Sequence, residues 1–127
     1  MRRIVVFSLE GTATLPALPP PFYPTPLDAP NVILNNELAN KGLGIYDSKC
    51  FLCHGGGAVA GGMAPDLRAS PIPVEKAAFA TVVRDGAKAK MGMPAFPDLS
   101  DEELSSLMHY IRRQARSGLK SAASGGH

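Results

Sequence analysis

Two cysteines and a histidine stand together near the middle of the chain, in the string Cys50-Phe51-Leu52-Cys53-His54. Two thiols separated by two residues can form a redox-active pair, half of a zinc site, or the attachment points of a covalently held cofactor. The histidine adds a ring nitrogen that can bind a metal ion. The residues around this string decide among the three chemistries.

The order of these residues favours covalent attachment of one haem c through Cys50 and Cys53. The two thiols add across the two haem vinyl groups, and His54 then lies beneath the iron as its expected ligand. A zinc site needs two further ligands, and only His109 and His127 remain. A redox dithiol lies between a strand and a helix, whereas this string ends a helical segment and opens a glycine-rich loop. The zinc and dithiol alternatives stay open at this point.

A haem that only transfers electrons has a second axial ligand, and we expect it to be Met93. This methionine lies in a loop rich in glycine and proline, about forty residues after His54, so an intervening helix can carry it across the ring. Pro94 favours an extended backbone at Met93 and stiffens the loop. Met91 is the second candidate and Met63 the third.

Three helical segments, separated by loops rich in glycine and proline, are expected to position these residues: 36–49, 74–85 and 100–115. Gly86 suits the position just after the second segment. Ser100 and Glu103 form a capping box at the start of the third, which carries an apolar stripe along one face. No strand is needed between the first and last segments. The pattern therefore predicts an all-α domain of about three main helices.

The first 35 residues differ from the rest. Residues 4–11 combine β-branched and aromatic residues before a glycine, which predicts a short strand without a partner in this chain. Seven prolines lie between residues 16 and 30, and such a stretch forms a semi-rigid extended spacer. The expected organisation is a remnant of a preceding domain's last strand plus a proline-rich linker at 1–35, a helical domain at 36–116, and a flexible tail at 117–127.

Composition narrows the class of protein. A chain of 127 residues supports one domain with one core. Aromatic residues make up only 6% and tryptophan is absent, and a core this light is often completed by a cofactor. Basic and aromatic residues are too sparse for a nucleic-acid surface. No segment approaches the ~20 apolar residues that span a bilayer.

Several motifs together resemble those of class I cytochrome c domains over residues 37–115. The matching residues are Gly42, Tyr46, the Cys50–His54 string, Ala64-Pro65-Asp66-Leu67, Gly92-Met93-Pro94-Ala95-Phe96, and Tyr110. The resemblance implies that the first and last helices cross at Gly42 and Tyr110. It also implies that the carbonyl group of Pro65 accepts the second N–H group of the haem-ligating histidine.

A longer stretch, residues 54–68, is similar to the C-terminal haem domain of type II quinohaemoprotein alcohol dehydrogenases. This narrower resemblance implies a preceding propeller domain that contains pyrroloquinoline quinone (PQQ), joined through an extended linker. It makes Arg68 a candidate partner for a haem propionate. We expect the apolar wall of the haem to be formed by Leu67, Val83 and Phe96.

The resulting expectation is a single-electron relay rather than an enzyme in its own right. A PQQ dehydrogenase domain would supply the electrons, and a periplasmic copper protein or cytochrome would accept them. Haem attachment through thioethers is normally completed outside the cytoplasm, so the expected location is the periplasm. The alternatives are a freely diffusing monohaem carrier, and a haem sensor or peroxidase in which Met93 dissociates.

Overall fold

The structure is a computed structural model that describes residues 4–20, 22–60 and 63–125. A few residues named in the predictions above are not among these. Pro21 of the proline-rich segment, Gly61 and Gly62 of the glycine-rich loop, and His127 of the predicted tail lie outside the described residues. The same holds for residues 1–3 of the predicted N-terminal segment.

Within the described residues the chain is all-helical, as predicted. Its α-helices are α1 (Asn36–Lys49), α2 (Phe51–His54), α3 (Lys76–Val83) and α4 (Asp101–Ser124). Short 3₁₀ turns connect them: η1 (Gly56–Ala58), η2 (Leu67–Ala69), η3 (Ile72–Val74) and η4 (Ala89–Met91). The first helix has the predicted bounds. The second is shorter than predicted at both ends: Val74 belongs to η3, where prolines interrupt the α-helical pattern, Glu75 is the N-cap, and the helix ends at Val83.

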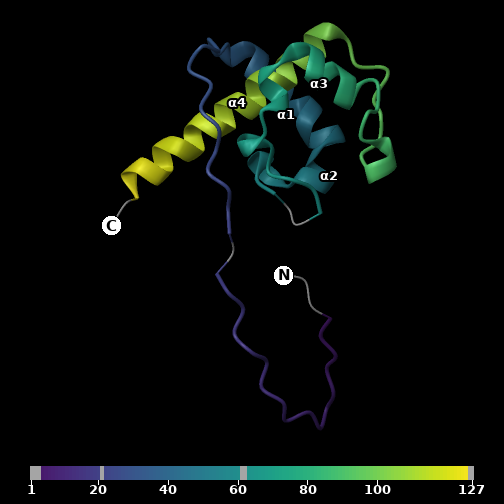
Figure 1. The fold of residues 1–127 in the computed structure, drawn as a ribbon, viewed down its shortest axis with the longest axis vertical. Coiled ribbons are helices and arrows are strands. Elements are labelled where there is room, and N and C mark those ends of the chain that lie inside the picture. Colours follow the sequence, from purple (N-terminus) through teal and green to yellow (C-terminus); the bar gives the residue numbers. More distant parts are fainter. Residues whose placement is uncertain (1–3, 21, 61–62, 126–127) are drawn as a thin grey trace.

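Helices α1 and α4 pack against each other and cross within the helical body (Figure 1). Gly42 is the closest point of the crossing, because a Cβ atom there would overlap the backbone carbonyl group of Ser106. Tyr46 and Tyr110 lie one helical turn farther along, with ring centroids 4.9 Å apart. Gly42 and Tyr110 thus both belong to the crossing, but Gly42 contacts Ser106 whereas Tyr110 packs against Tyr46.

Helix α4 begins as predicted and ends later than predicted. Ser100 accepts a hydrogen bond from the Glu103 N–H group, and the Glu103 carboxylate accepts one from the Ser100 N–H group, which completes the capping box. The helix continues to Ser124, so residues 117–124 of the predicted tail are helical. Extending an existing helix requires no new nucleation, and this outweighs the weak propensities of the serines and Gly118.

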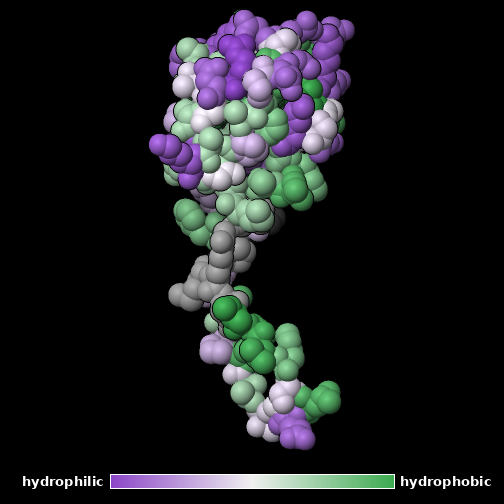
Figure 2. All heavy atoms as spheres, turned by 90° about the vertical axis from the view of Figure 1, so that its right-hand side faces the viewer, coloured by the Kyte–Doolittle hydropathy of each residue, from purple (hydrophilic) through white to green (hydrophobic). Residues whose placement is uncertain are grey.

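The N-terminal residues 4–20 form neither helix nor strand. The short strand predicted at 4–11 is not formed, because a strand needs a partner and the described residues supply none. The side chains of Ile4, Val6, Phe7 and Leu9 are almost fully exposed. Figure 2 shows this segment as a narrow tail below the helical body, with hydrophobic side chains open to solvent.

Residues 23–32, which we call the strap, return to the helical body and pack across α4 (Figure 1). The Leu27 N–H group donates to the carbonyl group of Arg68 at 2.8 Å. The Arg116 guanidinium donates to the carbonyl groups of Ala29 and Val32. The proline-rich segment is predicted as a semi-rigid extended spacer, and the structure adds that its second half is held by the helical domain.

Candidate functional site

The short helix α2 places the two cysteines and the histidine on one turn. Cys50 ends α1 and caps α2, and its carbonyl group accepts hydrogen bonds from the N–H groups of Cys53 at 3.3 Å and His54 at 3.0 Å. Gly55, with a φ of 75°, ends the turn in a conformation that favours glycine. The cysteines are not joined by a disulfide. Both thiols therefore remain available for attachment at a fixed spacing.

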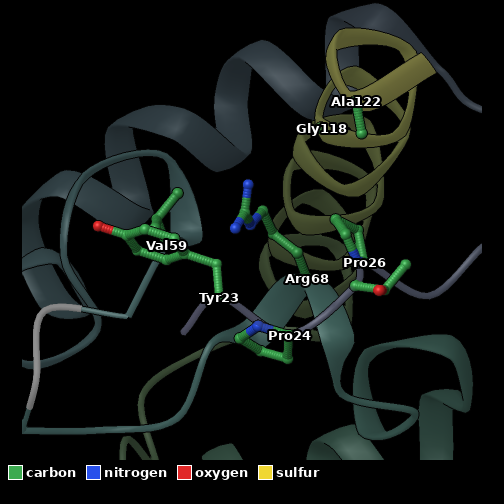
Figure 3. A pocket seen from close by; sticks show the side chains of 8 residues that line it. Tyr23, Pro24, Pro26, Val59, Arg68, Gly118 and Ala122 are labelled. Carbon is green, nitrogen blue, oxygen red and sulfur yellow. The ribbon is translucent and has the colours of Figure 1, made fainter. Parts of the chain in front are cut away.

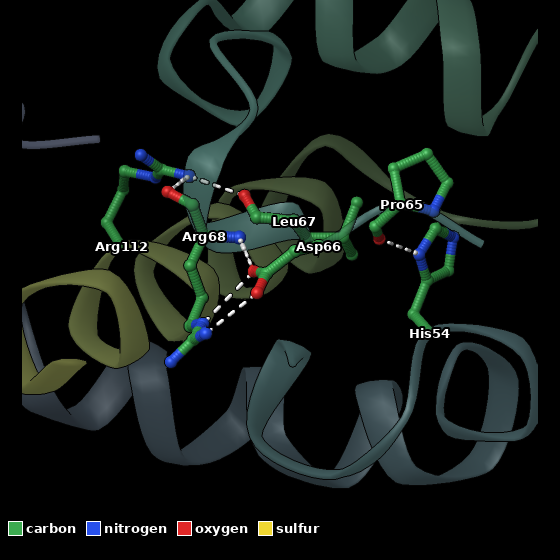
Figure 4. Close-up of polar contacts among 6 residues, drawn as sticks. All are labelled: His54, Pro65, Asp66, Leu67, Arg68 and Arg112. Carbon is green, nitrogen blue, oxygen red and sulfur yellow. Dashed lines mark hydrogen bonds and ion pairs between the residues drawn. The ribbon is translucent and has the colours of Figure 1, made fainter. Parts of the chain in front are cut away.

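The His54 side chain is buried, with 7% of its surface exposed, and its orientation is fixed. Its Nδ1 atom lies 3.1 Å from the Pro65 carbonyl oxygen (Figure 4). A carbonyl oxygen can only accept, so Nδ1 must carry the proton, and Nε2 keeps its lone pair for a metal ion. This contact is the one that the cytochrome resemblance implies. It gives His54 the tautomer that an axial iron ligand needs.

The environment of Cys50 argues against a redox dithiol. Burial raises the pKa of its thiol to about 11, whereas redox-active cysteines have lowered pKa values and react as thiolates. A thiol that stays protonated at neutral pH is a poor nucleophile for thiol–disulfide exchange.

His109 is poorly placed to complete a zinc site with the cysteines. Its Nδ1 atom accepts a hydrogen bond from the Asn35 N–H group at 3.3 Å, at the beginning of α1. The cysteines follow the other end of this 14-residue helix, which is about 21 Å long. Among the described residues no cluster of three histidine, cysteine, aspartate or glutamate side chains could hold a metal ion.

Burial separates the three methionines proposed as the second ligand. Met91 and Met63 are 78% and 72% exposed, whereas Met93 is half-buried and packs against the hydrophobic core. The loop around Met93 is tied down, because Phe96 donates its N–H group to the Val83 carbonyl at 2.8 Å. These contacts favour Met93 as the sequence does, while its ligation remains a prediction.

The residues predicted to wall the haem lie at one hydrophobic cluster. Val83 is buried in the core, and Leu67 and Phe96 are partly buried against it, together with Cys50 and Met93. An attachment cysteine, the predicted second ligand and the apolar wall therefore all contact the same hydrophobic core. With the ring tautomer of His54, this set of residues fits a haem group.

Arg68 pairs with a carboxylate of its own chain, whereas the family resemblance makes it a candidate partner for a haem propionate. Its Nε and Nη2 atoms donate to both carboxylate oxygens of Asp66, at 3.0 and 2.7 Å (Figure 4). Burial raises the Asp66 pKa, but the hydrogen bonds from Arg68 outweigh burial and leave that pKa below its ordinary value. A role at a haem propionate would require Arg68 to leave or share this carboxylate. That role stays an untested prediction.

Figure 3 shows where the Arg68 side chain points. It reaches into a cavity of about 430 Å³ between the strap and the end of α4. The cavity is lined by Tyr23, Pro24, Thr25, Pro26, Val59, Arg68, Gly118 and Ala122. In Figure 4 the Arg68 guanidinium and the His54 ring lie at opposite ends of the residues drawn. In this structure the Arg68 side chain therefore pairs with Asp66 and lines the cavity between the strap and α4.

Two residues make contacts near the site that were not predicted from the sequence. The Tyr46 hydroxyl group donates to the Gly55 carbonyl at 2.7 Å and so holds the end of α2. Arg112 is almost fully buried on α4 and donates to several backbone carbonyl groups. The signal for Tyr46 was its place one turn before Cys50. Arg112 had no comparable signal, because an arginine near the C-terminus of a helix is ordinarily an exposed charge.

Residues 37–111 match a protein-family model described as cytochrome C oxidase, cbb3-type, subunit III. The chain is 37% identical over 112 residues to quinohemoprotein alcohol dehydrogenase ADH IIB of Pseudomonas putida, covering 86% of this chain and 16% of that protein. It is 31% identical over 114 residues to the dehydrogenase subunit of an alcohol dehydrogenase (quinone) of Gluconobacter oxydans, covering 89% and 15%. It is 34% identical over 121 residues to lupanine 17-hydroxylase [cytochrome c] of a Pseudomonas species, covering 89% and 16%. The chain thus spans about a sixth of the length of these curated relatives.

Proposed function

Because this chain belongs to the cytochrome c domains of the cbb3-type subunit III family, we propose that it carries one covalent haem c and transfers single electrons. Cys50 and Cys53 would attach the group, and His54 and Met93 would ligate its iron. The observation that carries the proposal is the contact between His54 Nδ1 and the Pro65 carbonyl. It leaves Nε2 of a buried imidazole free to bind iron.

Bound at this site, a haem would supply a one-electron couple between ferric and ferrous iron. The chain's own residues would keep the coordination unchanged between the two states. Pro65 holds the His54 ring, and the bond from Phe96 to Val83 holds the loop that presents Met93. Leu67, Val83 and Phe96 would exclude water from the iron, and low water access helps to set the reduction potential.

The relatives suggest a context for this electron transfer. One of them is named a quinohemoprotein alcohol dehydrogenase, and another is named the dehydrogenase subunit of an alcohol dehydrogenase (quinone). We therefore assign the chain the role of an electron-accepting part of a PQQ-dependent alcohol dehydrogenase. It would pass electrons on to a periplasmic copper protein or cytochrome. None of the helices in the described part of the chain is long and apolar enough to cross a membrane.

Expression in a bacterial host that attaches haem c in its periplasm tests the proposal. We expect the haem to stay with the protein after acid–acetone extraction, and the reduced spectrum to be that of a thioether-linked haem. The variant in which Cys50 and Cys53 are both changed to serine should lose its haem in the same extraction. Loss of haem from the unmodified chain would contradict the proposal and return the dithiol alternative.

The dehydrogenase context needs a separate measurement. Stopped-flow mixing of the oxidised chain with an alcohol-reduced PQQ dehydrogenase should give reduction that depends on the concentrations of both proteins. A chain with covalent haem that takes electrons from small dyes but not from the quinoprotein would be a stand-alone carrier instead.

A further inference from the structure

Arg112 is a buried cation that has no acidic partner among the residues that the structure describes. Only 2% of its surface is exposed, and burial lowers its pKa. Its described hydrogen bonds all go to backbone carbonyl groups, and its Nε atom has no partner among the described residues. The acceptors are Leu67 at 2.8 Å, Ser70 at 3.2 Å, Leu27 at 3.3 Å and Arg68 at 3.5 Å. Burying a guanidinium whose only partners are neutral carbonyl groups costs free energy. The position of Arg112 therefore calls for an explanation.

These carbonyl groups belong to two segments that are far apart in the sequence. Leu27 lies in the strap, while Leu67, Arg68 and Ser70 lie in residues 65–70, which we call the 65–70 loop. The loop and the strap also bond directly, because the Leu27 N–H group donates to the Arg68 carbonyl at 2.8 Å. Arg112 and Leu27 therefore bind the strap and the loop together as one unit on α4.

The 65–70 loop reaches the candidate site at its other end. The Pro65 carbonyl accepts the hydrogen bond of His54, and the Leu67 carbonyl, two residues later, accepts one from Arg112 (Figure 4). Asp66 between them is buried and bonded to Arg68, so this stretch has little freedom. A shift of the Leu67 carbonyl would therefore move the Pro65 carbonyl as well.

We propose that Arg112 is a positioning residue that fixes the His54 ring through the 65–70 loop, and that the docked strap is part of this arrangement. The inference rests on the proposed haem site, because it concerns the residue expected to bind iron. The strap joins the helical body to residues 4–20, so whatever is attached before the strap is linked mechanically to the His54 ring. Arginine suits the role because its planar fork holds several acceptors at once, which a lysine ammonium on a flexible stem does not.

The test uses the full chain with its haem and substitutions that preserve charge. Arg112→Lys keeps the cation but loses the fork, and Leu27→Pro keeps every charge but removes the N–H group that binds the loop. Arg113→Lys is the control for the first, because Arg113 lies beside Arg112 on α4 but donates to Ala39 and Asn40 of α1. Leu27→Ala is the control for the second, since it keeps the N–H group.

Two quantities are measured: the reduction potential and the exchange rate of the His54 Nδ1 proton by nuclear magnetic resonance. We expect both Arg112→Lys and Leu27→Pro to shift the potential and to speed this exchange on the order of tenfold, as loss of about one hydrogen bond's free energy implies. Both controls should match the unmodified chain. If Arg112→Lys fails to fold, Leu27→Pro still tests whether the docked strap helps to fix the His54 ring through the 65–70 loop.

An unchanged potential and unchanged exchange in Arg112→Lys and Leu27→Pro would overturn the inference, even where stability falls, because Arg112 would then be a structural residue only. Failure of the proposed function has a different signature, namely a chain without covalent haem. In that case, two exchange rates can still be compared among the same four variants: that of the His54 Nδ1 proton and those of the backbone amides of the 65–70 loop. Equal exchange among them would overturn the inference too.

Discussion

Gly42 on α1 packs against the Ser106 backbone on α4 so closely that a methyl group on Gly42 would overlap the Ser106 carbonyl. The contact brings the two longest helices to backbone distance and sets the spacing at which Tyr46 meets Tyr110. Tyr46 in turn holds the Gly55 carbonyl at the end of α2. The helix crossing thus determines where the candidate haem-attachment turn lies.

Gly42→Ala is expected to destabilise the protein by about 3 kcal/mol, because neither backbone can yield without separating the helices. The measurement is denaturant unfolding of the haem-loaded chain, followed by circular dichroism. Gly44→Ala is the matched control on the same helix, since a Cβ atom there meets nothing within 4 Å. It should gain up to about 1 kcal/mol from the higher helix propensity of alanine. Equal stabilities for the two variants would contradict the assigned role of Gly42.

The parts of the fold that the sequence predicted well rest on local signals. The first helix and the capping box at Ser100 follow from side-chain spacing and from contacts within a few residues. The length of α4 was underestimated because its last two turns were judged on propensity alone. The docking of the strap was missed because prolines restrict the chain but do not say what it touches. Its anchors, Arg112 and Arg116, lie more than eighty residues away in the sequence.

In the candidate site, too, residues with local signals were predicted, whereas contacts between separate segments were not predictable from residue spacing. Cys50, Cys53 and His54 were evident because their chemistry depends on adjacent residues. The His54–Pro65 contact came from a family resemblance, since spacing alone does not say which carbonyl faces the ring. For Arg68, the sequence could not show that the Asp66 carboxylate, two residues away, would accept hydrogen bonds from both Nε and Nη2 of its guanidinium. A side chain with several possible partners is assigned only when the fold is known.

Asp66→Asn should destabilise the chain by about 3 kcal/mol, because it leaves the Arg68 guanidinium without its buried partner. Asparagine can still accept the hydrogen bond from the Arg68 N–H group, so the turn itself is retained. Asp85→Asn is the control, because the Asp85–Arg84 pair is more exposed and its closest atoms are 3.7 Å apart. Such a pair contributes about 0–1 kcal/mol. A similar loss in both variants, measured by urea unfolding at neutral pH, would contradict the importance of the Asp66–Arg68 pair.

The same carboxylate predicts a pH dependence. The pKa of Asp66 is lower in the folded chain than the ordinary value of 3.8, so the unfolded chain binds a proton more readily. Its contribution to stability is therefore complete above that ordinary value and is lost as the pH falls below it, through the lower folded pKa. Unfolding measured from pH 5 down to pH 2 should show a shallower loss of stability for Asp66→Asn than for the unmodified chain. Parallel curves would show that Asp66 does not carry this part of the acid sensitivity.

Ser100→Ala should destabilise the chain by about 1 kcal/mol, because it removes the side-chain oxygen that accepts the Glu103 N–H group. Ser117→Ala, at an exposed position inside the same helix, should be neutral or slightly stabilising, since alanine has the higher helix propensity. Thermal unfolding of both variants under identical conditions provides the comparison. A loss at Ser117 as large as that at Ser100 would show that the effect does not come from capping.

Met93→Ala is expected to remove the thioether–iron charge-transfer band from the ferric spectrum and to lower the reduction potential, because methionine ligation raises it. Met91→Ala is the matched control. It lies two residues away in the same loop, but its side chain is 78% exposed whereas Met93 packs against the core. Its spectrum and potential should equal those of the unmodified chain. If the band instead persists in Met93→Ala and disappears in Met91→Ala, the loop must rearrange to bury Met91, and the ligand assignment passes to that residue. If both variants keep the band, the ligand assignment passes to Met63.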